Sequence, residues 1–261
     1  NHIDRDNLLG GSRSDRSLNG GNWRAGLVFA VTDDLSLYGQ YSTSEDGVNN
    51  LVSLSPTQMD YDLTESKQTE LGLKQRFWDG RGEWTLAAYH IVKKKLLVDN
   101  PITHEPQQAG RQSSNGLEAS VELALANQWH VSANASLVRA KFDDFDEVVA
   151  GVAVDRSGNR PDNVPRRTAN VWLSKGFGQA LDAGVGLRYV DARYADTANS
   201  KRIPGYTVVD ANLGWQVLPD VRLGLQLNNL LNRDYVVSAY SGEQWLLGAP
   251  RSYFATVDYS F

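Results

Sequence analysis

Side chains alternate between apolar and polar at every second position through much of this 261-residue chain. The final stretch shows the pattern clearly: Tyr253, Val257 and Phe261 fall on one side of an extended strand, and Thr256 and Asp258 fall on the other. Because successive side chains of a β-strand point to opposite faces, this alternation gives each strand one apolar face and one mostly polar face. We therefore expect an all-β protein whose sheet meets two different environments.

The two-faced segments are long, and their connections alternate in length. About eleven segments follow one another, most with roughly ten or more residues, whereas globular strands usually have about 5–6. Short turns such as 32–34 and 79–82 alternate with long polar segments such as 45–64 and 143–163. Long strands with short turns at one rim and long loops at the other predict a transmembrane antiparallel β-barrel. The predicted strands span 22–31, 35–44, 65–78, 83–98, 113–126, 129–142, 164–177, 180–195, 206–217, 221–231 and 251–261.

The polar faces of these strands carry charges and amides that a dry core does not accept unpaired. Glu118, Glu122, Arg188 and Asp210 all alternate with Leu, Val or Ala positions. In a barrel they face a hydrated lumen, where we expect them to pair with one another or with a protein segment inside the barrel. A soluble sheet with one wet face is the alternative, but it predicts shorter strands and no asymmetry of the loops.

The strand count bears on domain organisation. Bacterial single-chain barrels have an even number of strands, whereas about eleven is half of 22, the number in the plugged outer-membrane transporters. We therefore predict that residues 22–261 form the C-terminal half of a 22-stranded barrel without its plug domain. Residues 1–21 are rich in Gly, Asn and Ser and are predicted to be the end of an extracellular loop. An exported barrel needs a signal peptide, and none is seen here, which favours a mature chain or part of a longer one.

Composition and motifs argue against other classes of protein. A formal net charge of −5 argues against nucleic acid as a partner. The four His residues show no H-E-x-x-H spacing, and no G-x-S-x-G elbow occurs. The pairing of His104 with Asp99 is the one candidate for an enzyme at the barrel rim, and we expect no catalytic residues. The acidic run 143–147 lacks the spacing of a calcium loop, so we expect a solvated loop and no metal site.

Two motifs near the end of the chain have a distinctive arrangement. N-N-L-L-N-R-D-Y occupies 228–235, G-A-P-R-S-Y-F occupies 248–254, and the last residue is Phe261. This ending resembles the C-terminus of TonB-dependent outer-membrane receptors, most of all the ferric-siderophore branch. The resemblance runs from about residue 23 to the end, with further similar stretches at 64–74, 115–122, 164–172 and 203–211.

The resemblance implies a receptor and transporter for ferric siderophores in the bacterial outer membrane, energised through TonB. It implies a ferric siderophore as ligand and no resident cofactor. The implied partners are the siderophore, an N-terminal plug domain with the remaining barrel strands, TonB through the missing N-terminal part, and the lipid bilayer with its lipopolysaccharide. The alternatives are a passive porin-like channel and a receptor of the same family for cobalamin or haem.

The long loops are expected to carry the ligand-binding residues, since loops on a rigid scaffold usually do so. Anionic ferric chelates attract Arg and Lys, and aromatic side chains stack on aryl rings and cations. Tyr240 and Trp245, in the last long loop near the barrel mouth, are the leading candidates. The other candidates with these properties are Tyr61, His104, Arg111, Arg193 and Tyr194.

Overall fold

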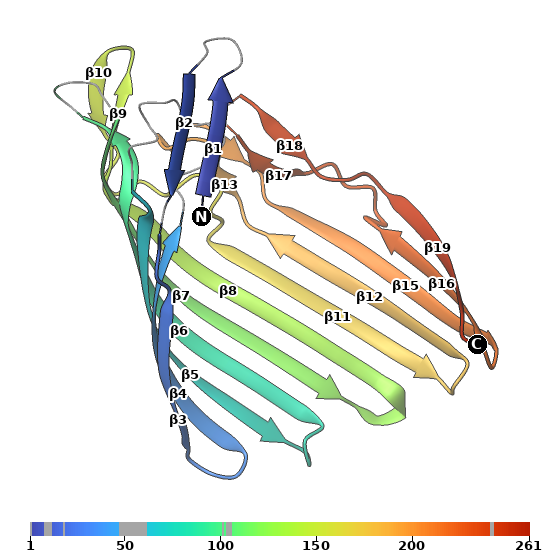
Figure 1. Cartoon of the computed structure of the whole chain (residues 1–261). Helices are drawn as coiled ribbons and strands as arrows, with labels where there is room; N and C mark the ends of the chain where they lie inside the picture. The colour runs from blue at the N-terminus through green and yellow to red at the C-terminus, as the bar shows by residue number, and fades with distance from the viewer. Residues whose placement is uncertain are drawn as a thin grey trace.

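The computed structural model describes residues 2–7, 12–17, 19–46, 62–100, 102, 106–240 and 243–261, which form one large antiparallel sheet and four two-stranded sheets. The large sheet has eleven strands, in the order β19-β16-β15-β12-β11-β8-β7-β6-β5-β4-β3. Figure 1 shows it as a curved, open wall. The predicted all-β fold with eleven antiparallel strands is confirmed. The strands are β3 (Trp23–Ala30), β4 (Leu35–Asp46), β5 (Thr64–Phe77), β6 (Gly82–Asp99), β7 (Pro106–Ala124), β8 (Trp129–Asp144), β11 (Arg167–Phe177), β12 (Leu181–Val190), β15 (Tyr206–Leu218), β16 (Val221–Asn228) and β19 (Ser252–Tyr259).

Short turns join consecutive strands at one edge of the sheet (Figure 1). Asp79 and Gly80, between β5 and β6, have φ angles of 55° and 81°, and Asn127, before β8, has a φ of 57°. Gly, Asn and Asp adopt this left-handed backbone more readily than other residues. Between β3 and β4, the amide of Leu35 donates to Oγ1 of Thr32. The turn residues seen in the sequence therefore set the short connections.

The sheet exposes an apolar face. Leu137, Leu213 and Val257 are 53%, 42% and 71% exposed. Leu213 pairs directly with Leu225, so the apolar side chains of neighbouring strands line up on one face. A continuous apolar band of this kind needs a non-aqueous surrounding, which the bilayer provides. In the part of the chain that the structure describes, no helix is long and apolar enough to span a membrane.

The opposite, polar face carries aromatic rings that lie over glycines of the neighbouring strand. A Cβ atom added at these glycines would lie only 2.1 to 2.4 Å from ring atoms. The ring therefore needs a residue without a side chain beneath it, and the pair packs flat against the sheet. The pairs are Tyr38 over Gly72, Tyr89 over Gly116, and Trp172 over Gly186.

Hairpins occupy the opposite edge, where the sequence predicts irregular loops. Figure 1 shows β1–β2, β9–β10 and β17–β18 at this end of the sheet. The strand predicted over 180–195 is also different, because β12 ends at Val190 and the chain then forms a separate short strand. The hairpin strands are β1 (His2–Asn7), β2 (Ser12–Ser17), β9 (Asp146–Val149), β10 (Val152–Asp155), β13 (Arg193–Tyr194), β14 (Arg202–Ile203), β17 (Val236–Ala239) and β18 (Trp245–Leu247).

The connection predicted over 99–112 is shorter in the structure. β6 runs on to Asp99 and β7 begins at Pro106, so their ladder continues past the predicted strand ends. The register shifts between Lys93 and Leu97, where Lys95 has a φ of 57°. A bulge of this kind lets two long strands stay paired while they bend.

Candidate functional site

Two outer hairpins, β13–β14 and β17–β18, pack together into one assembly above the large sheet. Ile203 is fully buried, and Ala195 and Ala239 are 3% and 6% exposed. Val236 packs against this cluster. Apolar burial here stabilises the hairpins, since each alone has too few residues to form a core. The two hairpins are therefore held against each other.

Arg193 is buried inside the assembly and joins its two hairpins by hydrogen bonds. Its side chain is only 3% exposed, and Nη2 donates hydrogen bonds to the backbone oxygens of Val236 (2.7 Å) and Val237 (2.5 Å). Its guanidinium also lies 6.0 Å from the centre of the Tyr206 ring. Burial lowers the pKa of Arg193. Among the described residues, Nη1 has no hydrogen-bond partner. This candidate ligand residue thus lies within the loop assembly rather than on its surface.

Asn163 joins a third segment to the same assembly. Its Nδ2 donates to the oxygen of Ala239 at 2.8 Å, and its Oδ1 accepts from the amide of Ala239 at 2.7 Å. Its own amide donates to the oxygen of Tyr194 at 2.8 Å. The φ angle of 59° is one that Asn tolerates better than most residues. Through its side chain and its backbone amide, this one residue therefore joins three segments that are far apart in the sequence.

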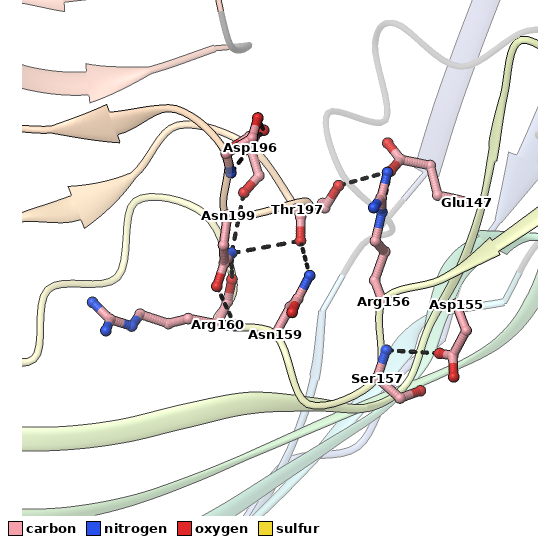
Figure 2. A network of polar contacts seen from close by, with 10 residues as sticks. Glu147, Asp155, Arg156, Ser157, Asn159, Arg160, Asp196, Thr197 and Asn199 are labelled. Carbon is pink, nitrogen blue, oxygen red and sulfur yellow. Dashed lines mark hydrogen bonds and ion pairs between the residues drawn. The ribbon is translucent and has the colours of Figure 1, made fainter.

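A polar network ties the β9–β10 hairpin to the loop between β13 and β14 (Figure 2). The carboxylate of Glu147 accepts from Nε of Arg156 at 2.9 Å and from the hydroxyl of Thr197 at 3.0 Å. Asn199 donates to the oxygen of Arg160 at 2.8 Å and accepts from its amide at 3.0 Å. Paired side-chain and backbone bonds of this kind fix the relative position of the two loops.

Asp143, the first residue of the acidic run, is paired with cations. Asp143 lies 3.2 Å from Nζ of Lys141 and 3.6 Å from Nε of Arg111. Asp146 lies opposite Asp155 in the β9–β10 ladder, and burial together with this like charge raises the pKa of Asp146. Within the described ranges, no group of three or more His, Asp or Glu side chains is arranged to hold a metal ion.

The structure brings four of the seven candidate ligand residues into the outer assembly. Tyr240, 77% exposed, and Trp245, 41% exposed, flank the connection between β17 and β18. The ring of Tyr194 lies 5.2 Å from the guanidinium of Arg160, and Arg193 is buried beside it. Of these, Tyr240 offers the most open aromatic surface.

The structure places one of the remaining three candidates. Arg111 is on β7, where its half-exposed side chain pairs with Asp143. Tyr61 and His104 fall outside the described residues. Of the candidates that the structure describes, Arg111 is therefore the one placed outside the outer assembly.

The sequence did not indicate the residues that lock the loops. Asn163 and Asn199 occur in stretches that read as turns, and both have positive φ angles, of 59° and 56°. Asn at a turn is a visible signal for this backbone. Its distant partner, in each case on another loop, has no signal in the sequence.

The first C-terminal motif is built around a buried asparagine. Asn229 is 2% exposed, and its Nδ2 donates to the oxygens of Arg233 (2.9 Å) and Ala249 (3.1 Å). Its Oδ1 accepts from the amide of Arg233 at 2.8 Å, and its own amide donates to Asp210 at 2.7 Å. The asparagine therefore connects the end of β16 to the chain that enters β19.

The second motif packs against the first. A Cβ atom added to Gly248 would lie 2.1 Å from the ring of Tyr235, and the Gly248 amide donates to the Tyr235 oxygen at 2.8 Å. The Tyr235 ring also lies 4.5 Å from that of Tyr206. The glycine of G-A-P-R thus leaves the space that the tyrosine ring of N-N-L-L-N-R-D-Y occupies.

Comparison with known proteins places this fold among characterised families. A family described as "TonB dependent receptor-like, beta-barrel" matches residues 1–230. The chain is 27% identical over 251 residues to the probable TonB-dependent siderophore receptor PiuA of Acinetobacter baumannii, covering 92% of the chain and 34% of that protein. It is 29% identical over 264 residues to the ferrioxamine receptor of Yersinia enterocolitica, covering 98% and 35%. The chain therefore spans about a third of the length of these relatives.

Solved structures show the same fold. The crystal structure of the siderophore receptor PiuA from Acinetobacter baumannii aligns with a TM-score of 0.84 at 24% identity, over 99% of this chain and 38% of that one. The unliganded ferric citrate transporter FecA aligns with a TM-score of 0.77 at 18% identity, over 100% and 41%. At these identities the likeness concerns the fold: the curved sheet corresponds to part of a barrel wall.

Proposed function

The chain belongs to the family of TonB-dependent receptors, and from this membership we propose that it supplies half of the barrel and several ligand-facing loops of a ferric siderophore receptor. Proteins of this family are transport proteins of the bacterial outer membrane rather than enzymes. The ligand of this receptor is a ferric siderophore, whose iron is cargo, and the chain has no catalytic residues and no cofactor of its own. Its protein partners are a plug domain, the remaining barrel strands and TonB.

The outer assembly is the structural observation that carries this proposal. The buried Ile203 cluster and the clamp of Arg193 hold β17–β18 in place, and Tyr240 and Trp245 are exposed on it. Exposed aromatic side chains on a fixed support lose little conformational entropy when a ligand binds. The names of several relatives, such as the ferrioxamine receptor, support a siderophore as the ligand class.

Growth of an iron-starved strain tests the transport function. A strain without its own siderophore receptors receives the intact receptor and is supplied with a panel of ferric siderophores. We expect growth on at least one of them, and we expect that growth to be lost when TonB is absent. Growth on no siderophore contradicts the ligand class, and growth without TonB points to a passive channel instead.

Substitution tests the part played by the outer assembly. Tyr240→Ala and Trp245→Ala should each weaken ligand binding about tenfold, because exposed aromatic anchors often contribute more than about 1 kcal/mol. Trp78→Ala is a matched control, since this aromatic residue is 54% exposed at the short-turn edge of the sheet. Equal effects of all three substitutions would show that the outer assembly does not form the ligand site.

A further inference from the structure

Four arginines line one hollow beside the outer end of β8. The β8 strand is bonded to residues on both sides of the hollow: the Val138 amide donates to the oxygen of Arg166, and the Phe142 amide donates to that of Asn159, each at 2.8 Å. Between 159 and 166 the chain leaves β8 and opens a hollow of about 490 Å³. Its lining includes Leu137, Arg139, Arg160, Arg166 and Arg167.

Positive charge at this hollow is mostly uncompensated. Arg167 forms an ion pair with Asp191, with 2.9 Å between Nε and Oδ2. Among the ion pairs of the described residues, no other carboxylate reaches any of the four arginines. Burial and the nearby Arg166 lower the pKa of Arg160, so the two like charges act on each other. An anionic group placed between them would relieve this repulsion.

The hollow borders the apolar face of the sheet. Arg167 pairs directly with Leu137, and Leu137 and Arg139 are two residues apart on β8, so all three share one face. On that face, closer to the short turns, a shallow apolar groove runs across β6, β7, β8 and β11. The side chains that line this groove on the apolar face include those of Trp84, Leu86, Val121, Ala133, Ala135 and Val171.

We propose that the arginine hollow binds the phosphate group of a membrane lipid whose acyl chain lies in the neighbouring apolar groove. Guanidinium groups match phosphate geometry with paired, charge-assisted hydrogen bonds. The apolar groove indicates that the phosphate belongs to a lipid, because a free phosphate ion has no apolar part to bury there. A phosphate-bearing lipid of the outer leaflet places its headgroup at the rim and its chains along the apolar face at the same time. This inference depends on the chain's position in the membrane and not on the identity of the transported ligand.

Native mass spectrometry of the intact receptor in detergent tests the proposal with lipid A as the probe. Lipid A with both phosphates is compared with lipid A from which the phosphates have been removed. We expect the phosphorylated form to bind the wild-type receptor at least about tenfold more tightly, because hydrogen bonds to charged groups contribute strongly. Equal binding of the two forms overturns the proposal, and this comparison needs no variant.

A pair of variants locates the site. Arg139→Gln combined with Arg166→Gln should reduce binding of phosphorylated lipid A about tenfold or more. The matched control is Arg188→Gln, which removes one positive charge from an exposed residue on the polar face of β12. Equal loss in the control, or no loss in the double variant, contradicts the site. If inorganic phosphate alone, at the same concentration, displaces the lipid completely, the hollow is a free-anion site and the lipid assignment is wrong.

Discussion

Asn229 holds the approach to the last strand, and its replacement should open this part of the barrel. The side chain makes three hydrogen bonds, two to Arg233 and one to Ala249, and is 2% exposed. At about 1 kcal/mol for each bond, Asn229→Gly should lower the free energy of local opening by about 3 kcal/mol. Asn229→Ala should lower it by about 4 kcal/mol, because a φ of 48° costs a residue with a Cβ about 1 kcal/mol more.

Amide hydrogen exchange of the intact receptor measures this opening. A change of about 3 kcal/mol corresponds to exchange about 150-fold faster in residues 228–252, since about 1.4 kcal/mol is a factor of ten. Asn228→Ala is the control, because the adjacent side chain makes only a long bond of 3.4 Å to Ser252 and an exposed bond of 2.9 Å from Gln226. It should change exchange less than about fivefold. Exchange within twofold of wild type in both Asn229 variants, or equal effects at 228 and 229, would refute this reasoning.

Two further predictions concern the outer edge. Gly248→Ala should destabilise the barrel by about 1–3 kcal/mol in urea unfolding, because the new Cβ would overlap the Tyr235 ring. In a Tyr235→Leu background, Gly248→Ala should cost much less. A cost that persists in that background would contradict the ring contact. Although burial alone raises the pKa of Asp191, the hydrogen bonds from Arg167 and the Ala192 amide hold it below its ordinary value. The stabilising effect of ionised Asp191 should therefore be fully present above about pH 4 and be lost as pH falls through the lower folded pKa. Amide exchange near residue 191 from pH 7 to pH 3 checks this, and Asp191→Asn should remove the pH dependence; an unchanged pH profile in that variant would point to another group.

The strands of the large sheet could be predicted because their signal is local. Leu117 and Leu137 alternate with polar residues in their own segments, and in the structure they pair with each other on the apolar face. Every second side chain of a strand faces the same side of the sheet, so each strand shows the alternation in its own sequence. The same logic located the short turns from residues such as Asp79 and Gly80.

The outer loops could not be predicted in the same way, because their contacts join distant segments. Glu147 bonds to Thr197, and Asn163 bonds to Ala239, across many residues of intervening chain. Arg193 was expected to face the ligand because Arg attracts anionic chelates, yet its side chain is buried and bonds to the backbone of β17. The motif N-N-L-L-N-R-D-Y was enough to identify the family. That Asn229 bonds to Ala249, and so joins the end of β16 to the chain before β19, is seen only in the structure.

The aromatic rings that lie over glycines have a consequence for the shape of the polar face. A ring such as Trp172, placed flat on Gly186, adds its thickness to the wall instead of its length. The ring thus adds contact surface between neighbouring strands while projecting little from the sheet. A methyl group at such a glycine would overlap the ring and displace it from the sheet, so these glycines set how far the aromatic side chains project from the polar face.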